Sequence, residues 1–193
     1  MNVKDSIRKR LNKSFAMISL VCSIGLVICG ISLFVISSQY HNALTNYGFA
    51  QGDIGKAMTT FSESRSSLRA VIGYVDESEI NSEKKDYETK KKAFEGYMQD
   101  VESKMVTKAG KEAYQQAESA LSSYWTKSDA ILQQGATTDK GASGAAQQKE
   151  INELGPMYDE IYASLKNIMD VNVAKGNSVQ GALNVLMYIL IIL

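Results

Sequence analysis

Two arginines in the stretch FSESRSSLR, residues 61–69, are the residues of this chain whose type and spacing best suit chemistry with an anion. The chain has four arginines and seventeen lysines; two of the arginines lie in a basic N-terminal segment, which leaves Arg65 and Arg69 as the only others. Residues four apart in a helix project to the same side, and paired guanidinium donors suit a carboxylate or phosphate. A salt bridge within or between subunits, for instance to Glu63 or to an acid on the last predicted helix, is an equally open interpretation.

The positions around Arg65 follow a helical heptad. Seam positions recur at alternating steps of four and three, and Arg65 occupies one of them, between Phe61 and Leu68. The seam consists of Tyr40, Leu44, Tyr47, Gln51, Ile54, Met58, Phe61, Arg65, Leu68, Ile72 and Val75. This pattern predicts an unbroken coiled coil that continues a preceding apolar helix and joins two copies of the chain into a homodimer. Arg65 would need an anion nearby, because an unpaired charge is costly to bury.

Three further stretches carry helical periodicity, and strand-like alternation is not evident between the apolar ends. These stretches cover about residues 87–105, 114–131 and 151–179. Polar breaks rich in glycine or capping residues separate the four predicted helices, at residues 76–83, 107–112 and 134–146. The predicted fold class is therefore all-α: an antiparallel up-down-up-down four-helix bundle flanked by two transmembrane helices.

The first apolar end is long enough to cross a membrane. Residues Phe15 to Ile36 are 22 uncharged residues, a length that spans roughly 33 Å as a helix. The basic cluster directly before this span places the N-terminus in the cytoplasm by the positive-inside rule. A cleaved signal peptide is the competing interpretation.

The second apolar end, Ala182 to Leu193, is twelve residues long, which corresponds to only about half a crossing. We interpret it as the start of a truncated second transmembrane helix; an interfacial or core-buried tail is the alternative. The predicted organisation is a cytoplasmic tail (1–14), a first transmembrane helix (15–37), an extracytoplasmic four-helix-bundle domain (38–181) and the start of the second transmembrane helix (182–193).

Several classes of function find little support in the sequence. The chain is neutral overall and its body is acidic beyond the N-terminal basic segment, which argues against nucleic-acid binding. The single histidine, His41, has no cysteine or histidine neighbours with which to hold a metal. In YGFAQGDIGKA, residues 47–57, Lys56 is followed by Ala57, where a phosphate-binding loop needs Ser or Thr. We therefore expect no enzyme activity, no cofactor and no metal site.

A ligand site can be placed by counting residues away from the membrane along the first and fourth predicted helices, starting near Ser38 and Ala182. At equal counts, the two arginines lie opposite the stretch EINELGPMYDE, residues 150–160. Gly155 and Pro156 in this stretch interrupt regular helical hydrogen bonding, so free carbonyls could receive the ammonium group of a ligand. The predicted ligand-binding residues are Arg65, Arg69, Asn152 and Tyr158.

The layout resembles the extracytoplasmic sensor of bacterial methyl-accepting chemotaxis proteins of the four-helix-bundle type. The resemblance covers essentially the whole chain and is most specific in FSESRSSLRAVIGY, residues 61–74, and LGPMYDEIYASLKNIMDVNVAKG, residues 154–176. It implies a homodimer in the bacterial cytoplasmic (inner) membrane that binds a small anionic ligand, such as an amino acid or organic acid, at or near the dimer interface. Aspartate receptors of this family use three such arginines, whereas this chain has two.

The resemblance also implies a mechanism. A small piston-like shift of the fourth helix and second membrane helix would act on a cytoplasmic kinase and adaptor, and membrane lipid would surround the spans. A ligand can drive such a shift only by binding one helix arrangement better than the other. Two other interpretations remain: the sensor half of a histidine kinase or cyclase, and a structural membrane-anchored helical protein in which the arginines fix helix register.

Overall fold

The structure, a computed structural model, describes residues 3–192, and every regular element in this range is a helix. The elements are α1 (Val3–Ala43), the π-helical turn η1 (Leu44–Phe49), α2 (Ala50–Gly73), α3 (Glu77–Lys104), α4 (Lys108–Gly135), α5 (Lys140–Lys149), the π-helical turn η2 (Glu150–Leu154) and α6 (Gly155–Ile192). The predicted all-α class is confirmed. Residues 1–2 of the predicted tail and Leu193 of the predicted second span lie outside the described residues.

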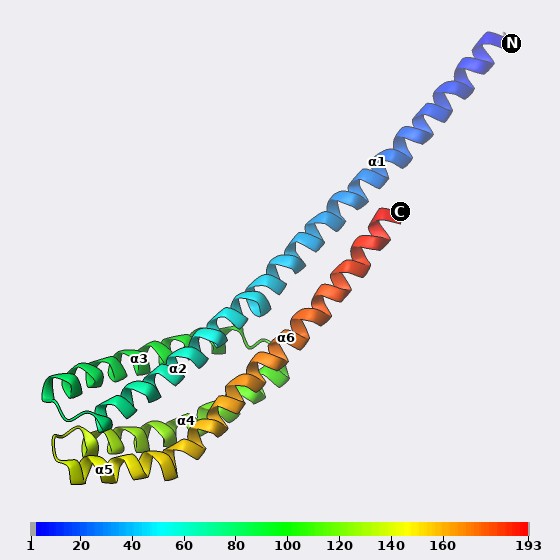
Figure 1. Cartoon of the computed structure of the whole chain (residues 1–193). Coiled ribbons are helices and arrows are strands. Elements are labelled where there is room, and N and C mark those ends of the chain that lie inside the picture. The colour runs from blue at the N-terminus through cyan, green and yellow to red at the C-terminus, as the bar shows by residue number, and fades with distance from the viewer. Residues whose placement is uncertain (1–2, 193) are drawn as a thin grey trace. The chain divides into compact units, whose positions relative to one another are not determined.

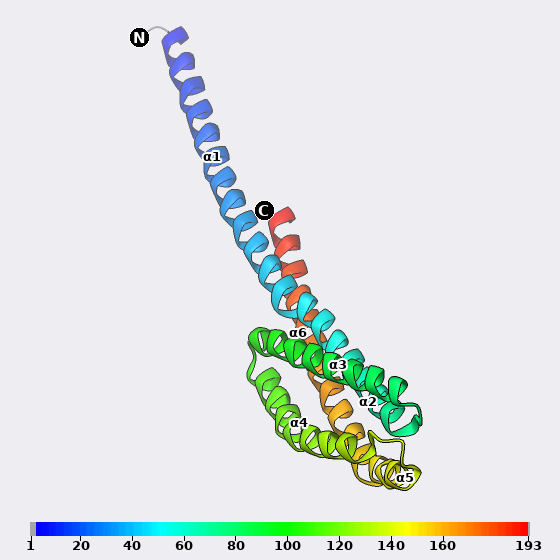
Figure 2. The same cartoon turned by 90° about the vertical axis from the view of Figure 1, so that its left-hand side faces the viewer.

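The chain divides into two compact units. One comprises the chain up to Ala43 together with the part from Val179 onward, and the other is Leu44–Ser178. The second unit holds four long helical segments: α2, α3, α4, and a fourth formed by α5, η2 and the part of α6 before Val179. Within this unit α2 packs beside α3 and α4 beside α5, and consecutive segments run in alternating directions (Figures 1 and 2). This is the arrangement of a four-helix bundle.

Side-chain caps set where the bundle helices begin. Asp76 Oδ1 accepts hydrogen bonds from the backbone N–H groups of Ser78 and Glu79 at 2.9 and 3.2 Å, which starts α3. Thr107 and Asp139 cap α4 and α5 in the same way. These residue types are preferred at such positions because their side chains satisfy N–H groups that the first helical turn leaves without a partner.

The caps shorten the predicted breaks. The connections are residues 74–76, 105–107 and 136–139, whereas the sequence pattern predicted breaks at 76–83, 107–112 and 134–146. The low-complexity composition of GATTDKGASGAAQQ, residues 135–148, predicts a loop at the bundle tip. This interpretation is wrong, because residues 140–148 belong to helix α5. Capping residues mark the start of a helix, and the pattern had counted the first helical turn as part of the loop.

Contacts with the end of α2 hold α5 in place. The Ser143 hydroxyl and the Gln147 amide both donate to the backbone carbonyl of Ile72, at 2.5 and 2.7 Å. Gly135, the last residue of α4, has no room for a side chain: a Cβ there would lie 2.5 Å from Ile72 Cγ2 and 2.7 Å from Ala146 Cβ. Small residues thus allow α2, α4 and α5 to approach closely at this end of the bundle.

An aromatic cluster forms the centre of the core. The Phe61 ring, on α2, lies 5.3 Å from Phe94, 5.0 Å from Tyr124, 5.8 Å from Trp125 and 5.0 Å from Tyr158, measured between ring centroids. These partners come from α3, α4 and α6, so one side chain contacts all of the other bundle segments. Aromatic pairs at these distances add to the free energy gained from burying apolar surface.

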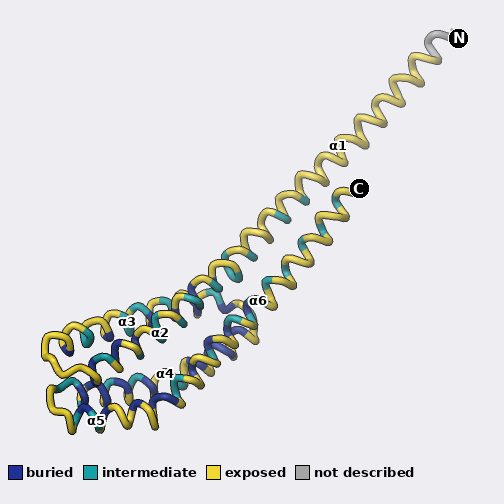
Figure 3. Tube along the Cα trace, in the orientation of Figure 1, coloured by how far each residue is buried: buried dark blue, intermediate teal, exposed yellow. Residues whose placement is uncertain are grey.

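The predicted seam of α2 faces this core. Ile54 is 1% exposed, and Phe61 and Leu68 are 0% exposed, within a single chain; Figure 3 shows these helices alternating between buried and exposed positions. The interpretation of the seam as a dimer interface is therefore wrong for these three positions, because their side chains are already covered by the bundle of their own chain. Tyr40, Leu44 and Val75, at the two ends of the predicted seam, are exposed. The heptad is also not unbroken, since the π-helical turn η1 interrupts it at Leu44–Phe49.

Helix α1 has the opposite character. Its large apolar side chains are exposed, for example Leu26 at 74% and Phe34 at 76% (Figure 3). Among the described residues, one continuous helical stretch, Ile7–Gly73, includes a window long and apolar enough to cross a membrane by length and composition. This is a weak sign of membrane association. The apolar end of α6 is also exposed, with Tyr188 at 67% and Ile191 at 79%.

Candidate functional site

Both bundle arginines bind one carboxylate. The Nε atoms of Arg65 and Arg69, on α2, donate to Oε1 of Glu150, the first residue of η2, at 2.8 and 2.9 Å. The Glu150 side chain is 3% exposed, that of Arg65 is 15% exposed and that of Arg69 is 52% exposed. The pair spaced four residues apart on α2 thus converges on a single point, as their predicted placement on one helix face requires.

Tyr158 orients the more buried arginine. The Arg65 guanidinium lies 4.2 Å from the centre of the Tyr158 ring, in the range of a cation–π contact. The same ring stacks on Phe61 at an interplanar angle of 10°, and its hydroxyl shares a hydrogen bond of 2.7 Å with Ser62. Two predicted site residues, Arg65 and Tyr158, are therefore in direct contact. The Tyr158 ring is held in turn by its packing against Phe61 of the aromatic core.

The electrostatics of the cluster favour an ionised Glu150 and leave positive charge over. Burial, the largest single effect, raises the pKa of the Glu150 carboxyl, but the hydrogen bonds and positive charges of Arg69 and Arg65 together lower it by more, so the pKa lies below its usual value. The hydrogen bond to Glu150 in turn raises the pKa of Arg69. Two guanidinium groups against one carboxylate leave a net charge of one positive. This arrangement can accept a further anion or exchange its present one.

A surface pocket opens beside the cluster. It has a cavity volume of about 360 Å³ and is lined by Arg69, Ile72, Gly73, Gln147, Glu150 and Ile151. The exposed half of the Arg69 side chain borders this space, and only its Nε is engaged by Glu150. A guanidinium has five N–H donors, so the other donors of Arg69 can bind a small ligand from this side.

The turn that carries Glu150 owes its geometry to the next residues. Gly155 N–H bonds the carbonyl of Glu150, five residues back, which is the π-helical pattern. Pro156 has no N–H with which to continue the regular α-helical ladder. A Cβ at Gly155 would lie 3.2 Å from Nη2 of Arg65, so glycine allows the arginine to lie against the backbone. The expectation that Gly155 and Pro156 disturb the helix opposite the arginines is confirmed.

The remaining predicted site residue, Asn152, is exposed on η2. In the described part of the chain, no hydrogen bond joins its side chain to Arg65 or Arg69. Sequence reasoning did not single out Glu150, although it considered an acid on the last helix as a partner. The sequence could have identified Glu150, because the residue count from the predicted membrane boundaries places Arg69 level with residue 151, next to Glu150.

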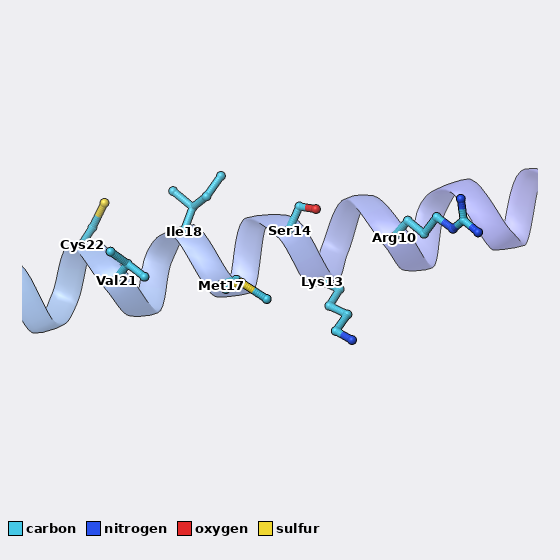
Figure 4. A pocket seen from close by; sticks show the side chains of 7 residues that line it. All are labelled: Arg10, Lys13, Ser14, Met17, Ile18, Val21 and Cys22. Atoms are coloured by element: carbon cyan, nitrogen blue, oxygen red, sulfur yellow. The ribbon is translucent and has the colours of Figure 1, made fainter.

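The other ion pairs and the hollow along α1 do not form comparable sites. Lys104 pairs with Asp53, and Asp129 binds both Lys91 Nζ at 2.7 Å and the Tyr87 hydroxyl at 2.8 Å, so these groups are satisfied within the bundle. A search of the described residues finds no group of three or more metal-ligating side chains. A hollow along α1, between Arg10 and Cys22, is formed by one helix alone (Figure 4) and has no enclosing wall from a second element in its lining.

Comparison with known proteins identifies the family. The chain matches, over residues 2–186, the family described as a four helix bundle sensory module for signal transduction, and it belongs to that family. The match covers the first apolar end, the bundle and the beginning of the second apolar end, in agreement with the resemblance noted in the sequence. A search of curated proteins finds no match. The class of protein that fold and family define is thus a sensory module of signal transduction.

Proposed function

We propose that this chain is the ligand-sensing module of a bacterial transmembrane chemoreceptor, without enzyme activity, and that Arg65 and Arg69 form its anion site. The observation that carries the proposal is the convergence of both guanidinium groups on one carboxylate beside an open pocket. A site that already holds the carboxylate of a glutamate has the donor geometry for the carboxylate of a small ligand. An amino acid or organic acid is the class of ligand that fits.

The membrane setting forms part of the proposal. The exposed apolar surface of α1 and of the end of α6 supports contact with lipid, since soluble monomers rarely leave large apolar patches uncovered. The basic residues before the first apolar stretch support a cytoplasmic N-terminus in the inner membrane. The bundle would then lie outside the membrane as part of a homodimer, and its signal would reach a cytoplasmic kinase and adaptor.

One structural observation favours a second candidate, a helical protein without a small ligand. Glu150 satisfies both arginines within the same chain, as a salt bridge that fixes helix register would do. The two candidates differ in what the arginines contribute: affinity for a ligand in the first, and only stability in the second.

Thermal-shift screening of the full chain in lipid nanodiscs against small carboxylates tests this difference. A specific ligand raises the melting temperature by mass action. The Arg69→Ala variant should fold and lose most of that shift, whereas the Lys85→Ala variant, at an exposed position of α3, should retain it. A ligand whose shift is the same in wild type and Arg69→Ala would place its site elsewhere. The absence of any shift across the panel would favour the structural candidate.

A further inference from the structure

Glu150 occupies an unusual place for a carboxylate. It is 2% exposed, while its neighbours along the chain, Lys149 and Ile151, are exposed. Acidic side chains are seldom so buried unless they are paired, and Glu150 is paired twice through one oxygen atom, Oε1. It is therefore held as a ligand would be held, with its carboxylate inside the arginine pair.

The same residue begins the π-helical turn that leads into α6. Its backbone carbonyl accepts the Gly155 N–H, and its side chain binds α2. Glu150 thus joins two features at one residue: the contact between α2 and the fourth bundle segment, and the irregular turn at the head of α6.

The arginine pair can be reached from outside. Arg69 is half exposed, and its exposed side borders the pocket whose wall includes Gln147. Gln147 is itself held by its hydrogen bond to the Ile72 carbonyl, so this wall is fixed in place. An incoming carboxylate can bind the free donors of Arg69 before Glu150 leaves.

We propose that Glu150 is the resident carboxylate of the arginine pair, and that a carboxylate ligand binds by replacing it and thereby releases the π-helical turn at the head of α6. This proposal rests on the function proposed above, since it assigns the regulation of that same site. The exchange trades one carboxylate for another, so the charge-assisted hydrogen bonds made and broken are alike.

The tether gives Glu150 an advantage over a free competitor. A group attached to the protein has a high effective concentration at its own site, in the millimolar range or above for short connections. A simple monocarboxylate should therefore fail to displace Glu150, whereas a ligand with further polar groups for the pocket should succeed. The prediction that follows is specific: a simple carboxylate binds once the tethered one is removed.

Acetate is the probe for this test, because it carries the atoms that Glu150→Ala removes beyond Cβ. The melting temperature of the full chain in nanodiscs is measured against sodium acetate, with sodium chloride at the same ionic strength as control. We expect Glu150→Ala to melt below wild type and to gain several degrees with acetate, while wild type gains none. The double variant Glu150→Ala with Arg65→Ala should lose the gain. Equal responses of Glu150→Ala and wild type to acetate would overturn the proposal.

Release of the turn is tested without removing the side chain. Glu150→Gln keeps the size of the residue but removes its charge, so it also serves if Glu150→Ala does not fold. Hydrogen exchange at the amides of residues 151–155 should accelerate at least tenfold in Glu150→Gln, while the amides of α4 keep their wild-type rates. Unchanged exchange at residues 151–155 would show that Glu150 does not hold the turn.

The acetate experiment separates this proposal from the function on which it rests. Acetate rescue of Glu150→Ala shows that the arginine pair exchanges carboxylates, even if no natural ligand is found for wild type. Conversely, a wild-type ligand that depends on Arg69, together with no acetate rescue, would retain the sensing function and overturn the role of Glu150.

Discussion

Asn172 of α6 donates a hydrogen bond from Nδ2 to the backbone carbonyl of Asn46 in η1, at 3.2 Å. The side chain is 5% exposed, and its Oδ1 has no partner within the described chain. Gly176, one turn further along α6, lies against Tyr47, where an added Cβ would be 3.3 Å from Tyr47 Cβ. A buried amide thus ties the fourth bundle segment to a turn whose own hydrogen-bond ladder is irregular.

The Asn172→Asp variant should be less stable than Asn172→Ala. Alanine removes the hydrogen bond to the Asn46 carbonyl, at a cost of about 0.5–1.5 kcal/mol. Aspartate places a buried acceptor against that carbonyl and adds a charge without a partner, which costs more. Melting temperatures of both variants in nanodiscs check the order. If Asn172→Asp were as stable as wild type, the amide would not be the donor in this contact.

Arg65 and Arg69 should contribute unequally to stability. Removing Arg65 breaks a charge-assisted hydrogen bond in a nearly buried setting, at a cost of about 1.5–3 kcal/mol. Removing Arg69, which is half exposed, should cost about 0–1 kcal/mol. Chemical unfolding of Arg65→Ala and Arg69→Ala measures the difference, and Arg65→Lys tests whether charge alone suffices. Equal losses from both alanine variants would contradict the burial argument.

The contribution of Glu150 should depend on pH. Its pKa is lowered from a usual value near 4.5 by the two arginines, so the folded state binds its proton less readily than the unfolded state. The stability this supplies is present above about pH 4.5 and is lost as pH falls through the lower folded pKa. The gap in melting temperature between wild type and Glu150→Gln should therefore narrow on acidification. Glu160→Gln, which removes an exposed carboxylate of α6, is the control, and a gap that widened would reverse the sign of the linkage.

Gly135→Ala should destabilise the bundle by about 1–3 kcal/mol. A Cβ at this position would meet Ile72 Cγ2 at 2.5 Å and Ala146 Cβ at 2.7 Å, and neither neighbour is the far end of a flexible side chain. Gly144→Ala, in α5, is the matched control, since a Cβ there meets nothing within 4 Å and helix propensity favours alanine by about 0.5–1 kcal/mol. Thermal unfolding of the two variants should shift in opposite directions. A stabilised Gly135→Ala would mean that α4 and α2 can separate at little cost.

We expect a homodimer formed through α2 to use the outer face of this helix, since Ile54, Phe61 and Leu68 of its seam are buried. In a background without Cys22 and Cys29, single cysteines at Thr59 or Ser66, which are exposed, should form disulfide-linked dimers in membranes. A cysteine at Ile54, 1% exposed, should not. Oxidative cross-linking followed by non-reducing gel electrophoresis measures both. Cross-linking at Ile54 alone would restore the seam as the interface.

The periodicity of apolar residues was sufficient to predict α2, α3, α4 and the α6 part of the fourth bundle segment, but not α5, which lacks large apolar residues. Seam positions such as Phe61, Phe94, Tyr124 and Leu165 are all buried, because helical period and burial are linked in any bundle. The period could not show whether the seam packs against helices of the same chain or against a second copy of the chain. A heptad indicates that a stripe is covered, and the same stripe serves a bundle core or a dimer.

The position of the candidate site could be predicted from the sequence, but not all of the residues that form it. Counting residues along two helices places Arg65 and Arg69 opposite residues 150–160, and the structure has Glu150 and Tyr158 in contact with them. Asn152 lies inside the π-helical turn, where one extra residue changes which side chains face α2. No propensity scale encodes such a turn, so an ordinary helical projection does not identify the facing side chain.

The π-helical turn η2 also gives this chain an unusual tolerance to a change in its length. Each residue of an α-helix turns the chain by about 100°, so losing one residue normally rotates every later side chain away from its partners. Residues 150–154 already hold one residue more than a regular turn needs. A lineage could therefore lose a single codon here, convert the turn to plain α-helix and keep both flanking faces in register. We therefore expect insertions and deletions in relatives of this module to occur at this turn, where the number of residues can change by one without loss of the fold.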